Sequence, residues 1–240
     1  VTLAANCSEK MTATKHCNGT DIWIVVHEYQ TSVFKSFLLS NSGVNLSPVN
    51  SAIGSVHSHF AGCMKASPNG RKLGVVIYGL GSELFDFDIT SGIVTNSLVL
   101  ISSPYGGYAC EFSSDGTKFY THTAGDLYQF DLCATTNLGI LASQYLVFSN
   151  PSGAGSMQLS TDGKIYFTES NIASNSLGVI NSPNSYSAAC NYSAGGLSIA
   201  PETTFSSLPN FVTSYFRKPP PTFSYVQNCM TLSFTPQCLN

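Results

Sequence analysis

Short runs of alternating apolar and polar residues, separated by turn residues, fill most of the first 200 positions of the chain. One unit recurs: an apolar residue, a small residue, a turn pair, and then an alternating strand that usually begins with a basic residue. The turn pairs are Asn69-Gly70, Asp115-Gly116 and Asp162-Gly163, with Asn18-Gly19 in a degenerate first copy. Asn-Gly and Asp-Gly between alternating runs predict β-hairpins, because both turn residues tolerate positive φ.

The spacing of these turns predicts the architecture. Successive turn glycines are 51, 46 and 47 residues apart, which is close to the length of one four-stranded propeller blade. We therefore predict an all-β fold, a β-propeller of four-stranded antiparallel blades. The four recognisable blades lie near residues 11–53, 61–100, 108–147 and 156–200.

The chain changes character after the fourth blade. Residues 208–216 predict the inner strand of a further blade, and the propeller would then span residues 1–216. The proline triplet at 219–221 cannot donate to a β ladder, so residues 217–222 are predicted to be a linker. Because the further strand has no outer strands of its own, we expect the missing blades to come from upstream sequence or from another chain.

Composition indicates an extracellular setting. Apolar residues make up 43% of the chain and charged residues only 10%, whereas roughly 25% is usual for a soluble domain. The net charge of −3 comes without any run of Lys or Arg, which excludes nucleic acid as a partner. No apolar run reaches the roughly 18 residues needed to span a bilayer. We expect a secreted or cell-surface protein.

The eight cysteines are even in number and irregular in spacing. They match no zinc-ligand pattern and favour an oxidising compartment with disulfides, the alternative being buried free thiols. In the predicted blades, Cys133 and Cys190 occupy the same loop of neighbouring blades. We therefore expect these two residues to form a disulfide.

A set of segments resembles a known family. Residues 9–19 together with Trp23 resemble the "KHxNG…W" segment of a propeller domain in Bacteroidota surface and gliding-motility-associated proteins. Segments 62–70, 83–88 and 208–211 agree, in the expected order. The resemblance implies export by the type IX secretion system and an Ig-like PKD domain after the propeller. Residues 223–240 are similar to the start of such a domain. The chain departs from the family in having more cysteines, and the family's propeller normally has blades upstream of the position that corresponds to residue 1.

Candidate site residues follow from the repeat. Alignment on the turn glycines places Lys65, Glu111 and Gln158 at one equivalent inner-strand position, with Thr14 opposite them in the first blade. Inner-strand residues that alternate away from the blade core face the central channel, so these four are predicted to line it. They would form a polar ligand site or, alternatively, only solvate the channel and pair with one another.

His57 and His59 lie in the loop before the second inner strand, near one mouth of the predicted channel. Alternate histidines could share a metal, but no Cys, Asp or Glu lies close in sequence, which favours an exposed loop without metal. The chain contains no G-x-S-x-G, H-E-x-x-H or Gly-rich phosphate motif. We expect no catalytic residue, metal or cofactor.

Two functional hypotheses remain. The first is a non-catalytic module that acts in adhesion, ligand binding or assembly of a surface structure, with an extracellular ligand, a glycan or another surface protein as partner. The second is a lactonase-like hydrolase in which channel carboxylates hold a divalent metal that activates water. Because Lys65 beside Glu111 would repel a metal, the sequence favours the first.

Overall fold

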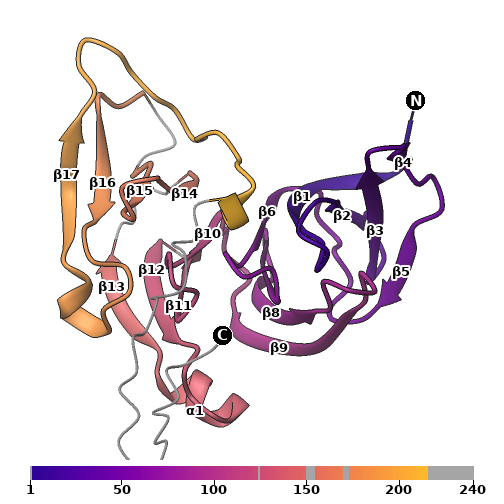
Figure 1. The fold of residues 1–240 in the computed structure, drawn as a ribbon. Helices are drawn as coiled ribbons and strands as arrows, with labels where there is room; N and C mark the ends of the chain where they lie inside the picture. The colour runs from indigo at the N-terminus through magenta and orange to yellow at the C-terminus, as the bar shows by residue number, and fades with distance from the viewer. Residues whose placement is uncertain (1, 124, 150–154, 170–172, 216–240) are drawn as a thin grey trace, which may run out of the picture.

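The structure is a computed structural model in which residues 2–123, 125–149, 155–169 and 173–215 are described. It contains four antiparallel sheets placed side by side, from the first sheet at the right of Figure 1 to the fourth at the left. Within each sheet, strands that follow one another in the chain are paired, except that β5 of the first sheet pairs with β3. The predicted all-β chain with four repeated sheets is confirmed.

The first two sheets occupy residues 7–102. The first contains β1 (Cys7–Lys15), β2 (Ile22–Glu28), β3 (Val33–Ser40), β4 (Gly43–Val44) and β5 (Val49–Ala52). Both β4 and β5 pair with β3, so they divide the position of a fourth strand between them. The second contains β6 (Gly62–Ala66), β7 (Lys72–Ile77), β8 (Gly81–Phe87) and β9 (Val94–Ser102).

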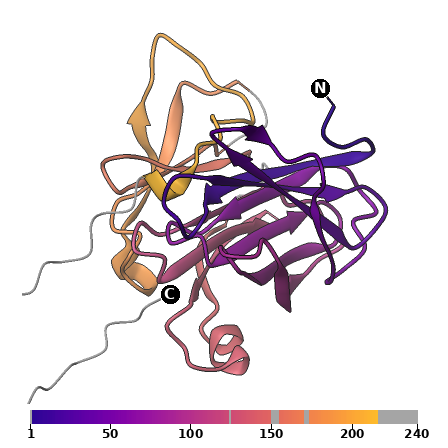
Figure 2. The ribbon, with the colours of Figure 1, turned by 45° about the vertical axis from the view of Figure 1, so that its right-hand side comes forward.

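The third and fourth sheets follow in the same manner. The third contains β10 (Ala109–Phe112), β11 (Lys118–Thr123), β12 (Asp126–Asp131) and β13 (Tyr145–Ser149). A short helix, α1 (Asn137–Ala142), precedes β13 and projects from the sheets in Figure 2. The fourth contains β14 (Met157–Leu159), β15 (Ile165–Phe167), β16 (Ser176–Ile180) and β17 (Tyr192–Ser198), with a 3-10 turn, η1 (Ser187–Cys190), before β17.

The recurring turns form as predicted, but only their glycines adopt positive φ. The values are +78° at Gly19, +75° at Gly70, +75° at Gly116 and +81° at Gly163. The preceding Asn or Asp instead accepts a backbone hydrogen bond on its side chain, as Asp115 does from the amide of Thr117 at 2.9 Å. An Asx side chain of this kind fixes the turn without strain in its own backbone.

The core lies between neighbouring sheets. The first strands, β1, β6, β10 and β14, lie next to one another in that order. Three apolar clusters fill the spaces between consecutive sheets: one around Trp23 and Phe85, one around Phe112 and Phe119, and one around Tyr120 and Leu159. Each of the inner strands β6 and β10 therefore has one face toward the sheet before it and one toward the sheet after it, whereas β1 and β14 stand at the ends of the described row.

Residues 208–215 differ from their prediction. They form no strand; the segment is irregular and ends in a 3-10 turn, η2 (Thr213–Tyr215). Pro209 has no amide hydrogen for a ladder, and side chains of this segment hydrogen-bond to the first and second sheets instead. The predicted linker at 217–222 and the predicted domain at 223–240 lie outside the described residues.

Close packing between the second and third sheets depends on Gly74 in β7. A Cβ atom built there would lie 2.1 Å from Cε2 of the buried Phe119. We therefore expect Gly74→Ala to destabilise the protein by about 1–3 kcal/mol through overpacking. Urea unfolding followed by the fluorescence of Trp23, the single tryptophan, measures this. Phe119→Leu should cost less in the Gly74→Ala background than alone, and strictly additive effects would contradict the explanation.

Candidate functional site

Three of the predicted site residues meet in a polar cluster between the inner strands, where they are joined by Asn210. We call this group the axial cluster; Lys65, Glu111 and Gln158 are buried in it, whereas Asn210 is exposed. The ammonium of Lys65 donates to Oε1 of Gln158 at 2.8 Å and to Oδ1 of Asn210 at 2.9 Å. It also lies 3.4 Å from Oε2 of Glu111. The side chains of Lys65 and Glu111 are only 4% and 0% exposed. Three successive sheets and the 208–215 segment thus each contribute one residue.

The remaining polar atoms of the axial cluster bind the backbone. Glu111 accepts from the amide of Phe112 on Oε1, at 2.9 Å, and from the amide of Leu159 on Oε2, at 3.1 Å. The Nε2 of Gln158 donates to the carbonyl oxygen of Leu159 at 2.8 Å. Both carboxylate oxygens and both amide groups of these side chains are therefore engaged within the protein.

The charge of Lys65 is stabilised in place. Burial alone lowers the pKa of this ammonium, but the attraction of Glu111, with smaller contributions from Cys63 and Cys110, leaves the pKa above its ordinary value. Lys65 is thus a fixed cation at neutral pH. A fixed cation 3.4 Å from the carboxylate occupies the place that a divalent metal would need.

The 208–215 segment connects the two ends of the row of sheets. Nδ2 of Asn210 donates to the carbonyl oxygen of Met11 in β1 at 3.0 Å. The hydroxyl of Thr213 donates to the carbonyl oxygen of Ala66 in β6 at 2.7 Å. The ammonium of Lys15 lies 4.1 Å from the ring centroid of Tyr215. The segment, gold in Figure 1, reaches from the fourth sheet back to the first two.

Two apolar faces remain accessible at the ends of the row. On the fourth sheet, a groove of about 500 Å³ runs between the sheet and the 208–211 segment. Its lining is mainly apolar and includes Leu177, Leu197, Leu208 and Phe211. On the first sheet, alternate positions are partly exposed and carry the apolar residues Met11, Ile22, Ile24 and Val26.

No protein family model and no curated protein matches the chain. Solved structures do. The periplasmic gluconolactonase PpgL of Pseudomonas aeruginosa is 14% identical and aligns with a TM-score of 0.50 over 70% of this chain and 52% of its own. The fold is a β-propeller.

Two further structures align over similar shares. Virginiamycin B lyase from Staphylococcus aureus is 13% identical, with a TM-score of 0.47 over 73% of this chain and 52% of its own. The C-terminal WD40 domain of Sif2 is 12% identical, with a TM-score of 0.45 over 72% and 45%. The chain spans about half the length of these structures.

Thr14 does not join the axial cluster. It has the predicted register, since it pairs with Trp23 as Lys65 pairs with Gly74. However, a Cβ on Gly70 would lie 2.5 Å from the Thr14 hydroxyl oxygen, which places this side chain between the first two blades. The prediction that Thr14 lines the channel is wrong, because its side chain is too short to reach past the neighbouring blade.

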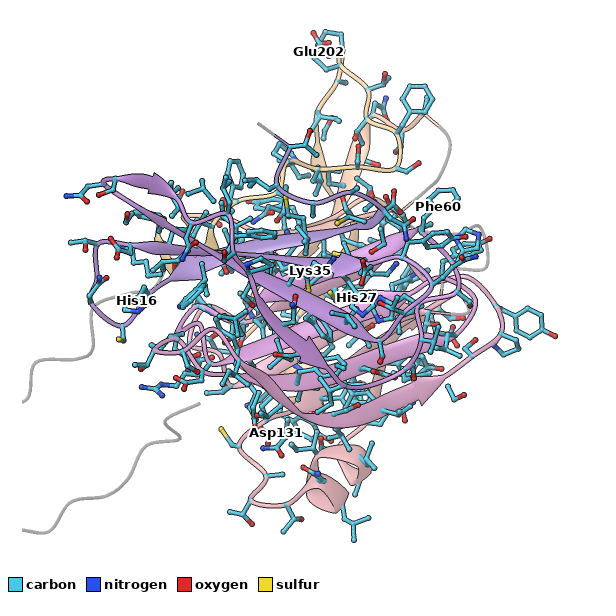
Figure 3. All side chains as sticks on the ribbon, turned by 90° about the vertical axis from the view of Figure 1, so that its right-hand side faces the viewer. His16, His27, Lys35, Phe60, Asp131 and Glu202 are labelled. Carbon is cyan, nitrogen blue, oxygen red and sulfur yellow. The ribbon has the colours of Figure 1, made fainter. Side chains whose placement is uncertain are left out.

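His57 is not at a channel mouth and not in an exposed loop. It is completely buried and stacks on His27, with ring centroids 3.3 Å apart. Figure 3 shows His27 within the body of the first blade, whereas His16 lies at its edge. His59 is partly exposed and lies against Phe60 and Tyr78 instead. The two predicted histidines therefore do not come together, because His57 packs into the apolar interior beside Phe34, whereas His59 does not.

The predicted Cys133–Cys190 disulfide is wrong. Cys133 is disulfide-bonded, but Cys190 is a free, buried thiol. Cys190 lies beside the phenol of Tyr120, between the third and fourth blades, and burial raises the pKa of its thiol. Equivalent loops in neighbouring blades thus do not bring these two sulfur atoms together.

Sequence reasoning missed Asn210 and His27. Asn210 lies in a segment whose apolar residues predict a strand, although Pro209 before it is a signal for irregular backbone. His27 alternates with apolar residues on the inward face of β2, which is a signal for burial. Within the described ranges, no group of three or more His, Cys, Asp or Glu side chains could hold a metal ion. The helices of the described ranges are all too short or too polar to cross a membrane.

The buried histidines predict acid sensitivity. Burial and the nearby charge of Lys10 lower the pKa of His27 to about 4, and burial, His27 and Lys10 lower that of His57 to about 2. Burial also lowers the pKa of His122 to about 4. The folded state holds these rings neutral, whereas the unfolded chain protonates them near pH 6.5. Stability should be complete above pH 6.5 and fall as the pH drops from 6.5 through about 4.

Urea unfolding at a series of pH values tests this expectation. His57→Phe should flatten the pH dependence of the free energy of unfolding below pH 6.5. His59→Phe, at the partly exposed neighbouring position, should leave it as in the wild type. Equal slopes in the wild type and the His57 variant would show that carboxylates, and not these rings, govern the acid response.

Proposed function

We propose that this propeller is a non-catalytic binding or structural module of a secreted or cell-surface protein. The observation that carries the proposal is that the hydrogen-bonding groups of the axial cluster are bonded within the protein itself. The ammonium, the carboxylate and the amide groups of the cluster bind one another and the backbone. Lys65, Glu111 and Gln158 are only 0–5% exposed. Groups used in this way hold blades together and have little capacity left for a substrate.

A lactonase-like hydrolase is less well supported. Such an enzyme would need two or more carboxylates that converge on a metal and an open position for water. At the axis only Glu111 contributes a carboxylate among the described residues, and Lys65 is its charge partner. The likeness to a gluconolactonase concerns the fold, and a shared fold does not transfer an activity.

The apolar end faces support a partner of β structure. The groove beside Leu197 and Phe211 lies on the side of the fourth blade where a next blade would pack, and the face with Met11 lies on the side where a preceding blade would pack. Uncovered sheet faces of this kind invite association. We propose that further blades cover them, supplied by sequence outside this chain or by another chain.

The extracellular setting has its own support. The disulfide at Cys133 fits an oxidising compartment, as does the low content of charged residues. With the four sequence segments that resemble Bacteroidota surface proteins, these features favour export by the type IX system and a role in adhesion or in assembly of a surface structure.

A lactone hydrolysis assay separates the two functions. The purified chain is incubated with sugar lactones, with and without Ca²⁺, Mg²⁺, Mn²⁺ or Zn²⁺, next to Glu111→Gln. We expect no hydrolysis above the uncatalysed rate in either protein, and lower stability in the variant. Metal-dependent hydrolysis that Glu111→Gln abolishes, while Trp23 fluorescence reports a folded protein, would overturn the proposal in favour of the enzyme.

A further inference from the structure

Two thiols from neighbouring blades lie together beside the axial cluster. Cys63 is in β6 and Cys110 in β10, and these inner strands lie side by side near the centre of Figure 1. Both side chains belong to the apolar cluster between the second and third blades, and they are within hydrogen-bonding reach of each other. The Sγ of Cys110 lies 3.5 Å from the carbonyl oxygen of Gly74, in the strand that pairs with β6. Both residues carry free thiols.

The two thiols differ in their burial and in the pKa that their surroundings give them. Cys63 is half-buried, whereas Cys110 is completely buried. The hydrogen bond from Cys110, together with the charge of Lys65, outweighs burial and lowers the pKa of the Cys63 thiol. Burial raises the pKa of Cys110 well above its ordinary value. Of the two thiols, Cys63 is therefore the one that ionises more easily, which makes it the attacking thiol and Cys110 its partner.

Cys63 lies near the end of β6 that borders an exposed side chain of β1. The residue before it, Gly62, donates its amide to Oε1 of Glu9 at 2.8 Å. Glu9 is exposed on β1 and also binds the phenol of Tyr108. Cys63 thus lies one residue from a solvent-facing group at the end of β6, and Cys110 lies behind it in the apolar cluster.

We propose that Cys63 and Cys110 form a reversible disulfide that joins the inner strands of the second and third blades in an oxidising compartment. The Cys63 thiolate attacks a small-molecule disulfide, whose S–S bond breaks; one half stays on Cys63 and the other leaves as a thiol after taking up a proton. Cys110 then loses its proton, attacks the sulfur of Cys63 and releases the second half. The cysteine pair loses two electrons, and the reagent is reduced to two thiols.

The pair differs from the other free thiols of the described chain. Cys7 begins β1, Cys17 lies in the first turn, and Cys190 is enclosed between the third and fourth blades. Cys190 is the matched control for Cys110, because it is as fully buried but lies beside a tyrosine. Among these free thiols, a disulfide within the chain should therefore form between Cys63 and Cys110.

The test is non-reducing peptide mapping of the intact chain. The protein is equilibrated in mixtures of oxidised and reduced glutathione, its remaining thiols are alkylated at low pH, and it is digested with trypsin. Cleavage after Lys35, Lys65, Lys72 and Lys118 gives peptides 36–65 and 73–118, with one cysteine each. We expect a linked species, two hydrogen atoms lighter than the sum of these peptides, and an upward shift of the urea midpoint of the oxidised protein.

Variants test the order of events. Cys110→Ala should retain glutathione on residue 63, Cys63→Ala should leave residue 110 unmodified, and Cys190→Ala should form the linked species as the wild type does. Trp23 fluorescence reports whether each variant is folded. If a variant does not fold, the peptide map of the wild type alone decides whether the Cys63–Cys110 disulfide forms. The proposal is overturned if both thiols remain free to alkylation at the most oxidising ratio, or if the link forms only after denaturation.

Discussion

The buried ammonium of Lys65 is the constraint on which the arrangement of the blades depends. Taking a charge out of water costs several kcal/mol unless a counter-charge and hydrogen bonds replace the lost hydration. Here the replacements come from Glu111, Gln158 and Asn210, on two further blades and the 208–215 segment. The second, third and fourth blades must therefore be in place together before the charge is satisfied. Apolar packing between blades has no such directional demand.

The 208–215 segment extends this constraint to the first blade. Asn210 accepts from Lys65 and donates to the backbone of β1, so one side chain connects the axial cluster with the first inner strand. The segment covers only part of the end faces, and the apolar groove beside it remains. The two apolar ends and the internally bonded axis are the observations that support the proposed binding or structural module.

The sequence predicted the blades because local signals decide them. Gly70, Gly116 and Gly163 adopt positive φ as the turns require, and a side-chain period of two then fixes which inner-strand residue faces the next blade. That is why the repeat alone aligns Lys65, Glu111 and Gln158 at one equivalent position. Whether they bind a ligand does not follow from that alignment and stays a prediction.

Other features depend on side-chain length or on distant contacts. Thr14 shares the register of Lys65 but is too short to reach the axis. His57 is buried because its ring packs against His27 and Phe34, which are 30 and 23 residues away in the sequence. The Asn210 contacts join residues 145 and 199 positions apart. No local sequence pattern encodes such pairs. For the same reason, the repeat could not show that Cys133 and Cys190 do not bond to each other.

A double-mutant cycle between Lys65 and Glu111 tests the central claim most directly. Free energies of unfolding are compared for the wild type, Lys65→Met, Glu111→Leu and the double variant, under one redox condition. Each single change leaves a buried charge without its partner and should cost about 3–5 kcal/mol, whereas the double variant should be no less stable than either single variant. Single variants within about 0.5 kcal/mol of the wild type, or strictly additive losses, would contradict an axis held together by this ion pair.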